Sequence, residues 1–333
     1  MNVLRKPLVA LLALALALGL FAPVAVAEKP LLPNEVGVRA YAYIQDLTRT
    51  ANPDGSYTPI LRVAGTPDEV AAAEKVAGWF EEIGYEAQFQ PFSYVRRDET
   101  YDSQNVVVHV PAAQKPKSSP TPLIIVGAHY DAVSAGAGAD DNASGVAVML
   151  EIAERISKYP NKFDLTFVAF GAEEVGLRGS AYHVSQMSAE DRARTVAMIN
   201  FDSLIVGDKL YIHAGSNGKT GPRDEMLRLI RLRRLPIEMQ PGLNPAYPAG
   251  TTPNGFSDYT AFNQAGIPIV AFESTNWEID DLDGYTQTEL HGSFWHTSKD
   301  TLETIEELYP GRPMERLEAY TTLVYEYLKH VKP

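Results

Sequence analysis

Five short clusters of acidic and histidine residues stand out because their side chains can bind metal ions and transfer protons. They are His129-Tyr130-Asp131, Asp140-Asp141-Asn142, Glu173-Glu174, Asp202 and His296-Thr297-Ser298-Lys299-Asp300. Carboxylates gathered in one place repel one another, and burying them as anions is costly unless a cation compensates. Mixed histidine and carboxylate ligands suit zinc, and two ions about 3.5 to 4 Å apart bridged by one carboxylate form a recurrent hydrolytic site. If the fold joins these clusters, they predict a centre for metal-dependent hydrolysis.

Three of the clusters follow segments that have the composition of strands buried on both faces. These segments are short, apolar and rich in β-branched or aromatic residues, and they lie at residues 123–126, 165–170 and 196–201. They lead into His129, Glu173 and Asp202. Because the carboxyl ends of the strands in an open α/β sheet form the ligand crevice, we expect the three clusters to converge.

Asp140 and Asp141 precede a helix that the pattern predicts over residues 144–159. Helix capping explains one such residue, because Asp, Asn and Ser are favoured at that position. It does not explain two adjacent acids beside a crevice that already holds His129 and Glu174. This cluster is therefore expected to join the others.

The remaining pattern alternates strands and helices, which indicates an α/β fold with a mixed sheet that is parallel at its centre. Thr66, Pro67, Asp68 and Glu69 supply an N-cap, a first-turn proline and first-turn acids for a helix that ends near Gly84. Further helices are predicted at residues 34–50, 258–264 and 310–330, and further strands at residues 85–92, 105–110 and 267–272. No repeat or linker divides the chain, so we expect one domain over residues 28–333.

Residues 1–27 have the order of a secretory signal peptide. Arg5 and Lys6 precede an apolar run over residues 8–21, and Ala25-Val26-Ala27 supplies a cleavage site. The alternative is a membrane anchor, which needs about 20 apolar residues, and Pro23 with the small residues after it argues against that. We expect a secreted protein that is not inserted in the membrane after cleavage.

Composition excludes several kinds of partner and stabilisation. The net charge of −13 gives no reason to expect binding to nucleic acid. The chain contains no cysteine, so it uses neither disulfides nor a lipid attached to a signal-region cysteine. Its stability must come from its core, for which the length suffices. We also expect a monomer.

The five clusters, in this order and at this spacing, resemble the ligand motifs of the secreted bacterial dizinc aminopeptidases, the leucyl aminopeptidase and aminopeptidase Y group. The resemblance covers residues 123–301. It implies a three-layer sandwich of the zinc-peptidase and phosphorylase type, with helices on both faces of the sheet. It also implies two zinc ions per chain, one held by His129 and Asp202, the other by Glu174 and His296, with Asp141 bridging both.

The same resemblance implies roles for neighbouring residues. Glu173 matches the general base, which takes a proton from the bridging water and passes it to the leaving amine. Asp131 is expected to accept a hydrogen bond from the free ring nitrogen of His129, and Asp140 to be structural. Trp295 stands where many relatives carry a tyrosine that helps to hold the oxyanion. Its indole N–H could donate instead, and Tyr259 is an alternative source of a hydroxyl group.

These assignments lead to the hypothesis of a secreted zinc aminopeptidase, acting on peptides with a free N-terminus, in which a metal-bridging hydroxide is the nucleophile. A metallo-carboxypeptidase or dipeptidase with the same metal pair is the nearest alternative. Glutaminyl cyclisation on the same fold would use one zinc ion, which the Asp141 bridge and the paired Glu173 and Glu174 disfavour. A non-catalytic binding protein would have lost metal ligands, and none is lost here.

The sequence leaves the preferred first residue of the substrate open. Aromatic residues gather in the C-terminal third, and some of them could line an apolar pocket for the substrate's first side chain. The acidic run at residues 278–283 is either a solvated loop or a rim that attracts a substrate ammonium. The other histidines are expected to pack or to lie in loops and on the surface; they are His109, His183, His213, His291 and His330.

Overall fold

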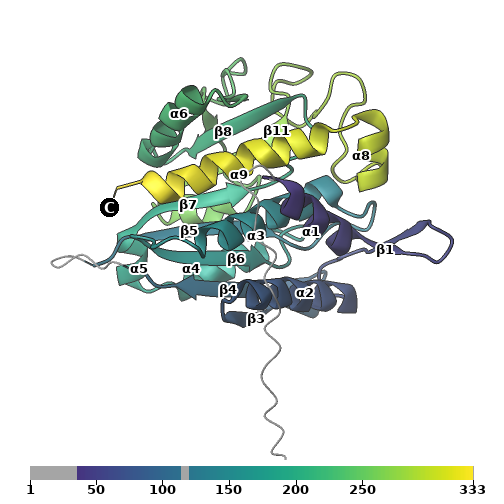
Figure 1. Ribbon diagram of the computed structural model, residues 1–333, viewed down its shortest axis with the longest axis horizontal. Helices are drawn as coiled ribbons and strands as arrows, with labels where there is room; N and C mark the ends of the chain where they lie inside the picture. The colour runs from purple at the N-terminus through teal and green to yellow at the C-terminus, as the bar shows by residue number, and fades with distance from the viewer. Residues whose placement is uncertain (1–35, 114–119, 333) are drawn as a thin grey trace, which may run out of the picture. The chain divides into compact units, whose positions relative to one another are not determined.

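A mixed sheet forms the centre of the described chain, which comprises residues 36–113 and 120–332 of this computed structural model (Figure 1). Its strands, in spatial order, are β10 (Thr251–Thr252), β8 (Lys209–Gly215), β11 (Ile269–Thr275), β7 (Thr195–Phe201), β5 (Leu123–His129), β6 (Asp164–Phe170), β4 (Glu99–Val110) and β3 (Ala87–Arg96), with β9 (Ile237–Glu238) beside β8. The central strands β11, β7, β5 and β6 are parallel, whereas β8 and β4 run antiparallel to their inner neighbours. The prediction of a mixed sheet with a parallel centre is confirmed.

Helices cover both faces of the sheet, as the family resemblance implied. They are α1 (Val38–Thr48), α2 (Pro67–Ile83), α3 (Gly145–Ile156), α4 (Arg178–Gln186), α5 (Ala189–Arg194), α6 (Gly221–Arg233), α7 (Tyr259–Gln264), α8 (Leu302–Leu308) and α9 (Arg312–His330). One core cluster joins α1, α2, α3, α6, α8 and α9 to one face, and a second joins α4 and α7 to the other face. Figure 1 looks onto the first layer, where α9 crosses in front of the strands. A small hairpin of β1 (Arg49–Ala51) and β2 (Tyr57–Pro59) pairs separately.

Side chains along the central strands alternate between the two core clusters, which explains their unbroken apolar runs. In β5, Ile124 and Val126 face the layer of α1, α3 and α9. Leu123 and Ile125 face α4 and α7. Burying an aliphatic side chain of this size contributes about 1.5 to 3 kcal/mol, so the sheet is stabilised by both helix layers.

The helix predicted to begin after Thr66 is confirmed as α2. Pro67 lies in its first turn, and the chain leaves it through Gly84, whose φ of 103° is a left-handed conformation that favours glycine. The Thr66 side chain does not cap the helix, because its hydroxyl donates to Val63 O at 2.6 Å. Glu69, expected only as a first-turn acid, is buried and contacts the loop that carries Glu173.

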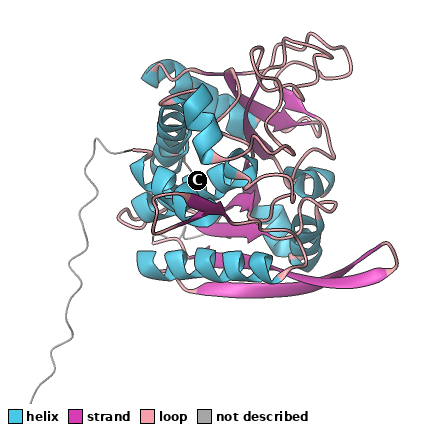
Figure 2. Cartoon of the chain, turned by 90° about the vertical axis from the view of Figure 1, so that its right-hand side faces the viewer, coloured by secondary structure: helices cyan, strands magenta, loops and turns pink. Residues whose placement is uncertain are grey.

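The strands predicted at residues 85–92 and 105–110 are longer than the apolar pattern indicated. They form one antiparallel hairpin, β3 and β4, which turns at Arg97 and Asp98. Figure 2 shows this hairpin along its lower edge, beside α2. The turn end is largely exposed, so hydrophobic periodicity carried no signal there.

The apolar pattern did not predict β8 or the helices α6 and α8, and it gave no bounds for the helices α4 and α5, which lie between the predicted strands at residues 165–170 and 196–201. The helix predicted over residues 144–159 is α3, and a π-helical turn, Ala139–Ser144, precedes it. Asp141 interrupts that turn with non-helical angles, φ −110° and ψ 91°. This local departure from helix geometry orients the Asp141 side chain. A residue that only capped the helix would not require it.

The predicted signal peptide at residues 1–27 lies outside the described residues, as does the expected domain start at residue 28. Both stay predictions. Asn34–Pro333 groups into one compact unit. Within residues 36–113 and 120–332, no helix combines the length and the apolar character that a membrane span requires.

His183 of α4 packs against Phe170 and Phe262 in the second core cluster. Burial, with a smaller contribution from the charge of His109, lowers the pKa of His183 to about 4 from 6.5. Because the pKa of His183 is lower in the folded state than in the unfolded state, the neutral side chain makes its full contribution to the unfolding free energy above pH 6.5. This contribution is lost as the pH falls toward 4. Between pH 7 and pH 5 this loss amounts to about 2 kcal/mol.

We expect His183→Gln to flatten the decline of the unfolding free energy between pH 7 and pH 5, measured by urea titration at several pH values. His330→Gln, at an exposed histidine, is the matched control and should keep the wild-type slope. Equal slopes for wild type and His183→Gln would contradict the assignment.

Candidate metal centre

Asp141 lies between two histidine side chains at the carboxyl edge of the sheet. Its Oδ1 is 3.3 Å from His129 Nε2, and its Oδ2 is 3.3 Å from His296 Nε2. His129 is the last residue of β5, and the π-helical turn brings Asp141 back beside that strand end. The two oxygens of one carboxylate therefore face two different imidazole nitrogens, which is the arrangement that a bridging ligand needs.

Glu174 and Asp202 reach the same place from the ends of β6 and β7. Asp202 Oδ1 is 3.5 Å from His129 Nε2, and Glu174 Oε2 is 3.0 Å from His296 Nε2. Ligand atoms of His129, Asp141 and Glu174 lie within 4.8 Å of one another. All five residues predicted as metal ligands thus come together.

Glu173 joins this cluster and lines a cavity of about 380 Å³ that opens beside it. Its carboxylate lies within 4.8 Å of ligand atoms of His129 and Asp202. Burial raises the pKa of Glu173 well above its ordinary value, despite the opposing charge of His129. A carboxyl group whose proton affinity is raised in this way suits general acid–base chemistry.

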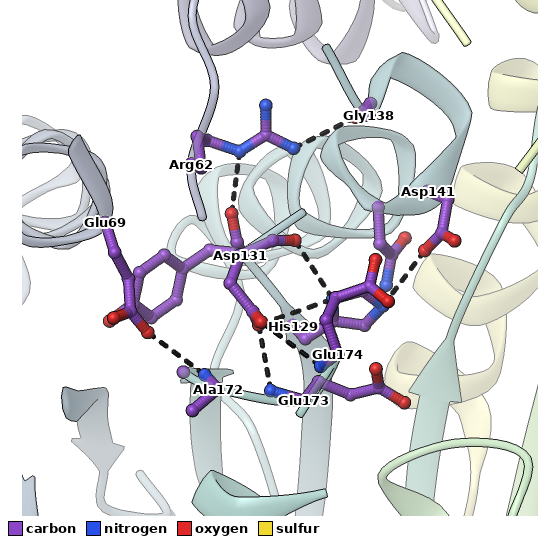
Figure 3. A network of polar contacts seen from close by, with 12 residues as sticks. Arg62, Glu69, His129, Asp131, Gly138, Asp141, Ala172, Glu173 and Glu174 are labelled. Carbon is purple, nitrogen blue, oxygen red and sulfur yellow. Dashed lines mark hydrogen bonds and ion pairs between the residues drawn. The ribbon is translucent and has the colours of Figure 1, made fainter. Parts of the chain in front are cut away.

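Asp131 holds the loop that presents Glu173 and Glu174 (Figure 3). Its Oδ1 accepts the N–H of Glu173 at 3.0 Å, and its Oδ2 accepts the N–H of Glu174 at 3.2 Å. His129 Nδ1 lies 3.2 Å from the carbonyl oxygen of Asp131 and 3.6 Å from its carboxylate. The closer partner of the histidine ring is therefore the Asp131 backbone, while the carboxylate mainly orients the two glutamates.

Glu69 of α2 supports the same loop from the other side (Figure 3). Its Oε1 accepts the N–H of Ala172 at 3.0 Å and the hydroxyl of Ser103 at 2.6 Å, and its Oε2 accepts the N–H of Gly65 at 2.6 Å. Ala172 has a φ of 53°, which costs a residue with a side chain about 1 kcal/mol or more unless its surroundings enforce it. Burial, reinforced by the charge of Asp131, raises the pKa of Glu69 to about 7. Two buried carboxylates thus hold three consecutive N–H groups.

Asp300 holds the backbone of the Asp140 and Asp141 pair in a similar way. Its two carboxylate oxygens accept the N–H of Asp140 at 2.7 Å and that of Asp141 at 3.0 Å. The Asp140 side chain is bound elsewhere, where it accepts from the N–H of Ile205 at 2.7 Å and from the Gln287 amide at 2.5 Å. These contacts fit the structural role expected for Asp140.

Arg62 anchors the segment between His129 and Asp141 (Figure 3). Its buried guanidinium donates to the carbonyl groups of Tyr130 at 2.7 Å, Ala137 at 2.5 Å and Gly138 at 3.0 Å. Sequence patterns did not identify Arg62 or Glu69, because both bind backbone groups far away in the chain. Asp300 stood in the fifth cluster, although the sequence assigned it no role.

The cluster strongly attracts positive charge. Burial opposes the charged form of Asp141, yet hydrogen bonds from His129 and His296 hold its pKa below its ordinary value. Hydrogen bonds to Asp141 and Glu174 raise the pKa of His296 to about 11. Burial raises the pKa of Glu174 to about 7, and the charge of Asp141 adds to this rise. The carboxylates therefore favour the binding of cations, and protons on the histidines compensate only part of their negative charge.

A zinc ion fits this donor set. Two imidazole nitrogens and several carboxylate oxygens converge, which is the ligand chemistry that zinc favours. Glu174 Oε1 is buried and has no hydrogen-bond partner within residues 36–113 and 120–332. A buried polar atom without a partner requires an explanation, and an oxygen directed at a cation supplies one.

Comparison with protein families identifies the chain. The model of peptidase family M28 matches residues 105–317. The chain belongs to peptidase family M28. The matched segment contains Glu173 and the five predicted ligands, whereas Arg62 and Glu69 lie before it. The family resemblance predicted from the sequence is confirmed.

This M28 peptidase is similar to several named bacterial proteins. It is 33% identical over 279 residues to the alkaline phosphatase isozyme conversion protein of Escherichia coli K12, a match that covers 75% of this chain and 80% of that protein. It is 31% identical over 235 residues to aminopeptidase YwaD of Bacillus subtilis 168, which covers 69% of this chain but only 46% of that longer protein. The solved structure of BSAP, a zinc aminopeptidase from Bacillus subtilis, superposes with a TM-score of 0.68 at 18% identity, over 90% of this chain and 96% of that one. This likeness shows the shared fold.

The two residues considered for holding an oxyanion both line the cavity of the M28 peptidase but differ in their partners. The Tyr259 hydroxyl donates to Pro253 O at 2.7 Å and lies 2.6 Å from Thr252 Oγ1. Trp295 Nε1 is buried and has no hydrogen-bond partner in the described part of the chain. The indole N–H is therefore the donor that is still available to a substrate.

We expect Asp131→Asn to lower zinc affinity about 10- to 100-fold, the usual effect of losing an outer partner of a metal ligand. The amide nitrogen of asparagine cannot accept from an N–H group, so one of the two hydrogen bonds that the N–H groups of Glu173 and Glu174 make to this side chain would be lost. Competition with a chromogenic chelator measures the affinity. Asp102→Asn, which alters an exposed contact with Ser93 on the β3–β4 hairpin, should leave it unchanged. Wild-type affinity in Asp131→Asn would refute this role.

Proposed function

We propose that the chain is an exported aminopeptidase that holds two zinc ions and hydrolyses the first peptide bond of peptides with a free N-terminus. The observation that carries the proposal is the position of Asp141, whose two oxygens each lie 3.3 Å from a different histidine nitrogen. His129 and Asp202 would hold one ion, and Glu174 and His296 the other. When bound, the ions supply a water of lowered pKa and polarise the substrate carbonyl.

Glu173 is the proposed proton carrier. A carboxylate oxygen of Glu173 accepts a proton from the attacking water and returns it to the nitrogen of the leaving amine. The raised pKa of Glu173 helps the side chain to hold that proton between the two steps. Asp131 fixes the Glu173 backbone, so the carboxylate keeps its place beside the ligands.

Trp295 is the proposed donor to the carbonyl oxygen as negative charge develops on it. Its buried indole N–H lines the cavity and has no hydrogen-bond partner among the described residues. A preorganised donor of this kind stabilises an oxyanion without further reorganisation. Tyr259 is less suited, because its hydroxyl proton is already donated to Pro253 O.

The charge of the cavity favours an aminopeptidase over a carboxypeptidase. No lysine or arginine is found among the described residues that line it. Recognition of a substrate's terminal carboxylate relies on a cationic or similar donor, whereas a terminal ammonium is attracted by acids. Glu273 and Asp283 line the cavity without belonging to the proposed ligand set.

Export is proposed from the sequence of residues 1–27.

Replacing the proposed base tests its role directly. We expect Glu173→Gln to retain both zinc ions, measured by mass spectrometry of metal content, while kcat falls by at least about a hundredfold, the scale of a lost proton-transfer group. Glu190→Gln, at an exposed position in α5, is the control and should have wild-type turnover. Near-normal turnover in Glu173→Gln would remove Glu173 from the mechanism.

Removal of metal tests the class of reaction. We expect the protein to cleave aminoacyl reporter peptides but not N-blocked ones or reporters of C-terminal cleavage. A zinc chelator should abolish this activity, and two equivalents of zinc per chain should restore it. Cleavage confined to N-blocked peptides, or cyclisation of N-terminal glutamine with one zinc ion, would contradict the aminopeptidase assignment. Activity that resists the chelator would contradict the metal assignment.

A further inference from the structure

Part of the cavity is formed by a row of residues across three neighbouring strands. Asn200 of β7 pairs with Ala271 of β11, which pairs with His213 of β8, and all three line the cavity. Paired residues on neighbouring strands, about 4.8 Å apart, point to the same face. The small side chain of Ala271 therefore leaves room between its two larger neighbours.

Glu273 brings a carboxylate to this row from two residues further along β11, on the same face. Its Oε1 accepts the indole N–H of Trp277 at 2.5 Å and lies 2.8 Å from His213 Nε2. No hydrogen bond of Oε2 is found within the described residues, and the Glu273 side chain is 19% exposed. One oxygen is thus held by the protein, and the other is open to a ligand.

Asn200 adds a second acceptor without a partner. Its amide nitrogen donates to Ser257 Oγ at 2.9 Å, and the Ser257 hydroxyl donates to Asp202 Oδ2 at 2.6 Å. This chain of hydrogen bonds fixes the orientation of the amide and leaves Asn200 Oδ1 facing away from it. Oδ1 is buried and has no hydrogen-bond partner in the described chain, which is costly unless a ligand donates to it.

Negative charge in this part of the cavity is not balanced by lysine or arginine within the described lining. Asp283 also lines it. The following Gly284 packs so closely on Trp277 that a Cβ would lie 2.4 Å from a ring atom. Trp277 also donates to Glu273, so the backbone next to Asp283 packs on the residue that holds Glu273, and Asp283 Oδ1 accepts the N–H of Tyr285 at 2.8 Å. His213, expected from the sequence to be a packing or surface residue, is buried here, and its Nδ1 has no partner in residues 36–113 and 120–332.

We propose that these residues, named here the acceptor pocket (Asn200, His213, Ala271, Glu273 and Asp283), bind the ammonium or guanidinium group of a lysine or arginine side chain at the substrate's N-terminus. The proposal rests on the aminopeptidase function proposed above and adds the class of its preferred substrate. Lysine and arginine side chains offer several N–H donors and no acceptor, which complements the free oxygens of Glu273 and Asn200.

The acceptor pocket also lies within reach of the reaction. Asn200 precedes the proposed ligand Asp202 by two residues, so a substrate whose carbonyl lies at the metal centre can extend its first side chain along the row. An apolar side chain placed there would offer no hydrogen-bond donor to Glu273 Oε2 or to Asn200 Oδ1. The acceptor pocket receives the charged end of the first side chain, while aromatic residues that the sequence predicted for an apolar pocket, Phe256, Tyr285 and Trp295, line the same cavity.

The experiment compares kcat/KM of the zinc-loaded protein for aminoacyl p-nitroanilides of lysine, arginine and norleucine, because norleucine has the carbon chain of lysine without the ammonium. We expect lysine and arginine to exceed norleucine at least about 10-fold. Glu273→Gln keeps an acceptor for Trp277 but removes the charge. It should lower kcat/KM for lysine and arginine about 10- to 100-fold, the usual value of a charged hydrogen bond, and change norleucine much less.

Asp280→Asn is the matched control, because Asp280 is an exposed acid of the 278–283 run that does not line the cavity. It should leave the ratio of lysine to norleucine unchanged, whereas Asp283→Asn should lower it. A wild-type preference for norleucine would overturn the proposal. An equal loss for all three substrates in Glu273→Gln would also overturn it, because the carboxylate would then act on a group that they share.

Binding of free amino acids tests the acceptor pocket independently of peptide cleavage. It also keeps the test valid if the Glu273→Gln variant is inactive or poorly folded. Calorimetry on the wild type should show L-arginine binding at least about 10-fold tighter than L-norleucine, with this difference reduced in Asp283→Asn. That result supports the acceptor pocket even if no aminoacyl substrate is cleaved, an outcome that would refute only the proposed function. Equal or weaker binding of L-arginine would overturn the acceptor pocket while leaving peptide cleavage untouched.

Discussion

Crowded negative charge at the carboxyl edge of the sheet is the constraint on which this structure depends. The parallel strands β5, β6 and β7 deliver the residues that follow them to one edge, and Glu174 and Asp202 arrive there beside Asp141. Carboxylates this close favour any cation that comes between them, as the raised pKa of His296 shows. In the proposed function a pair of divalent ions would compensate this charge, and the histidines lie where such ions would need nitrogen ligands.

The surrounding protein resists this repulsion through main-chain hydrogen bonds to other buried acids. Asp131 and Asp300 each accept two backbone N–H groups of the segments that carry Glu173, Glu174 and Asp141, and Glu69 accepts one, that of Ala172. Arg62 adds positive charge and three donor contacts on the same side. Functional groups held by such a frame keep their geometry when charge at the site changes, which is the condition for preorganised catalysis.

Catalysis and substrate choice are assigned to different residues of the same strands in the scheme proposed here. Asp202 follows β7 at the metal centre, while Asn200 lies two residues earlier in the acceptor pocket. Glu273 sits on the adjacent strand, β11, and belongs to none of the five sequence clusters. Members of a family that share the ligand motifs can therefore differ in substrate through residues that those motifs do not include.

The sequence alone determined the fold class and predicted the acids and histidines that the structure brings together, because strands buried on both faces leave apolar runs and metal ligands are mostly histidines or acids. It did not locate β8, a buried strand that begins with Lys209 and contains His213, or the turn end of β3 and β4, whose exposed residues hide the period. Only the tertiary structure decided which polar groups meet. Glu69 binds Ala172 across 103 residues, and Glu273 faces the cavity through the register of β11 against β7 and β8. Such contacts depend on how strands align in space, and no local pattern in the chain encodes that alignment.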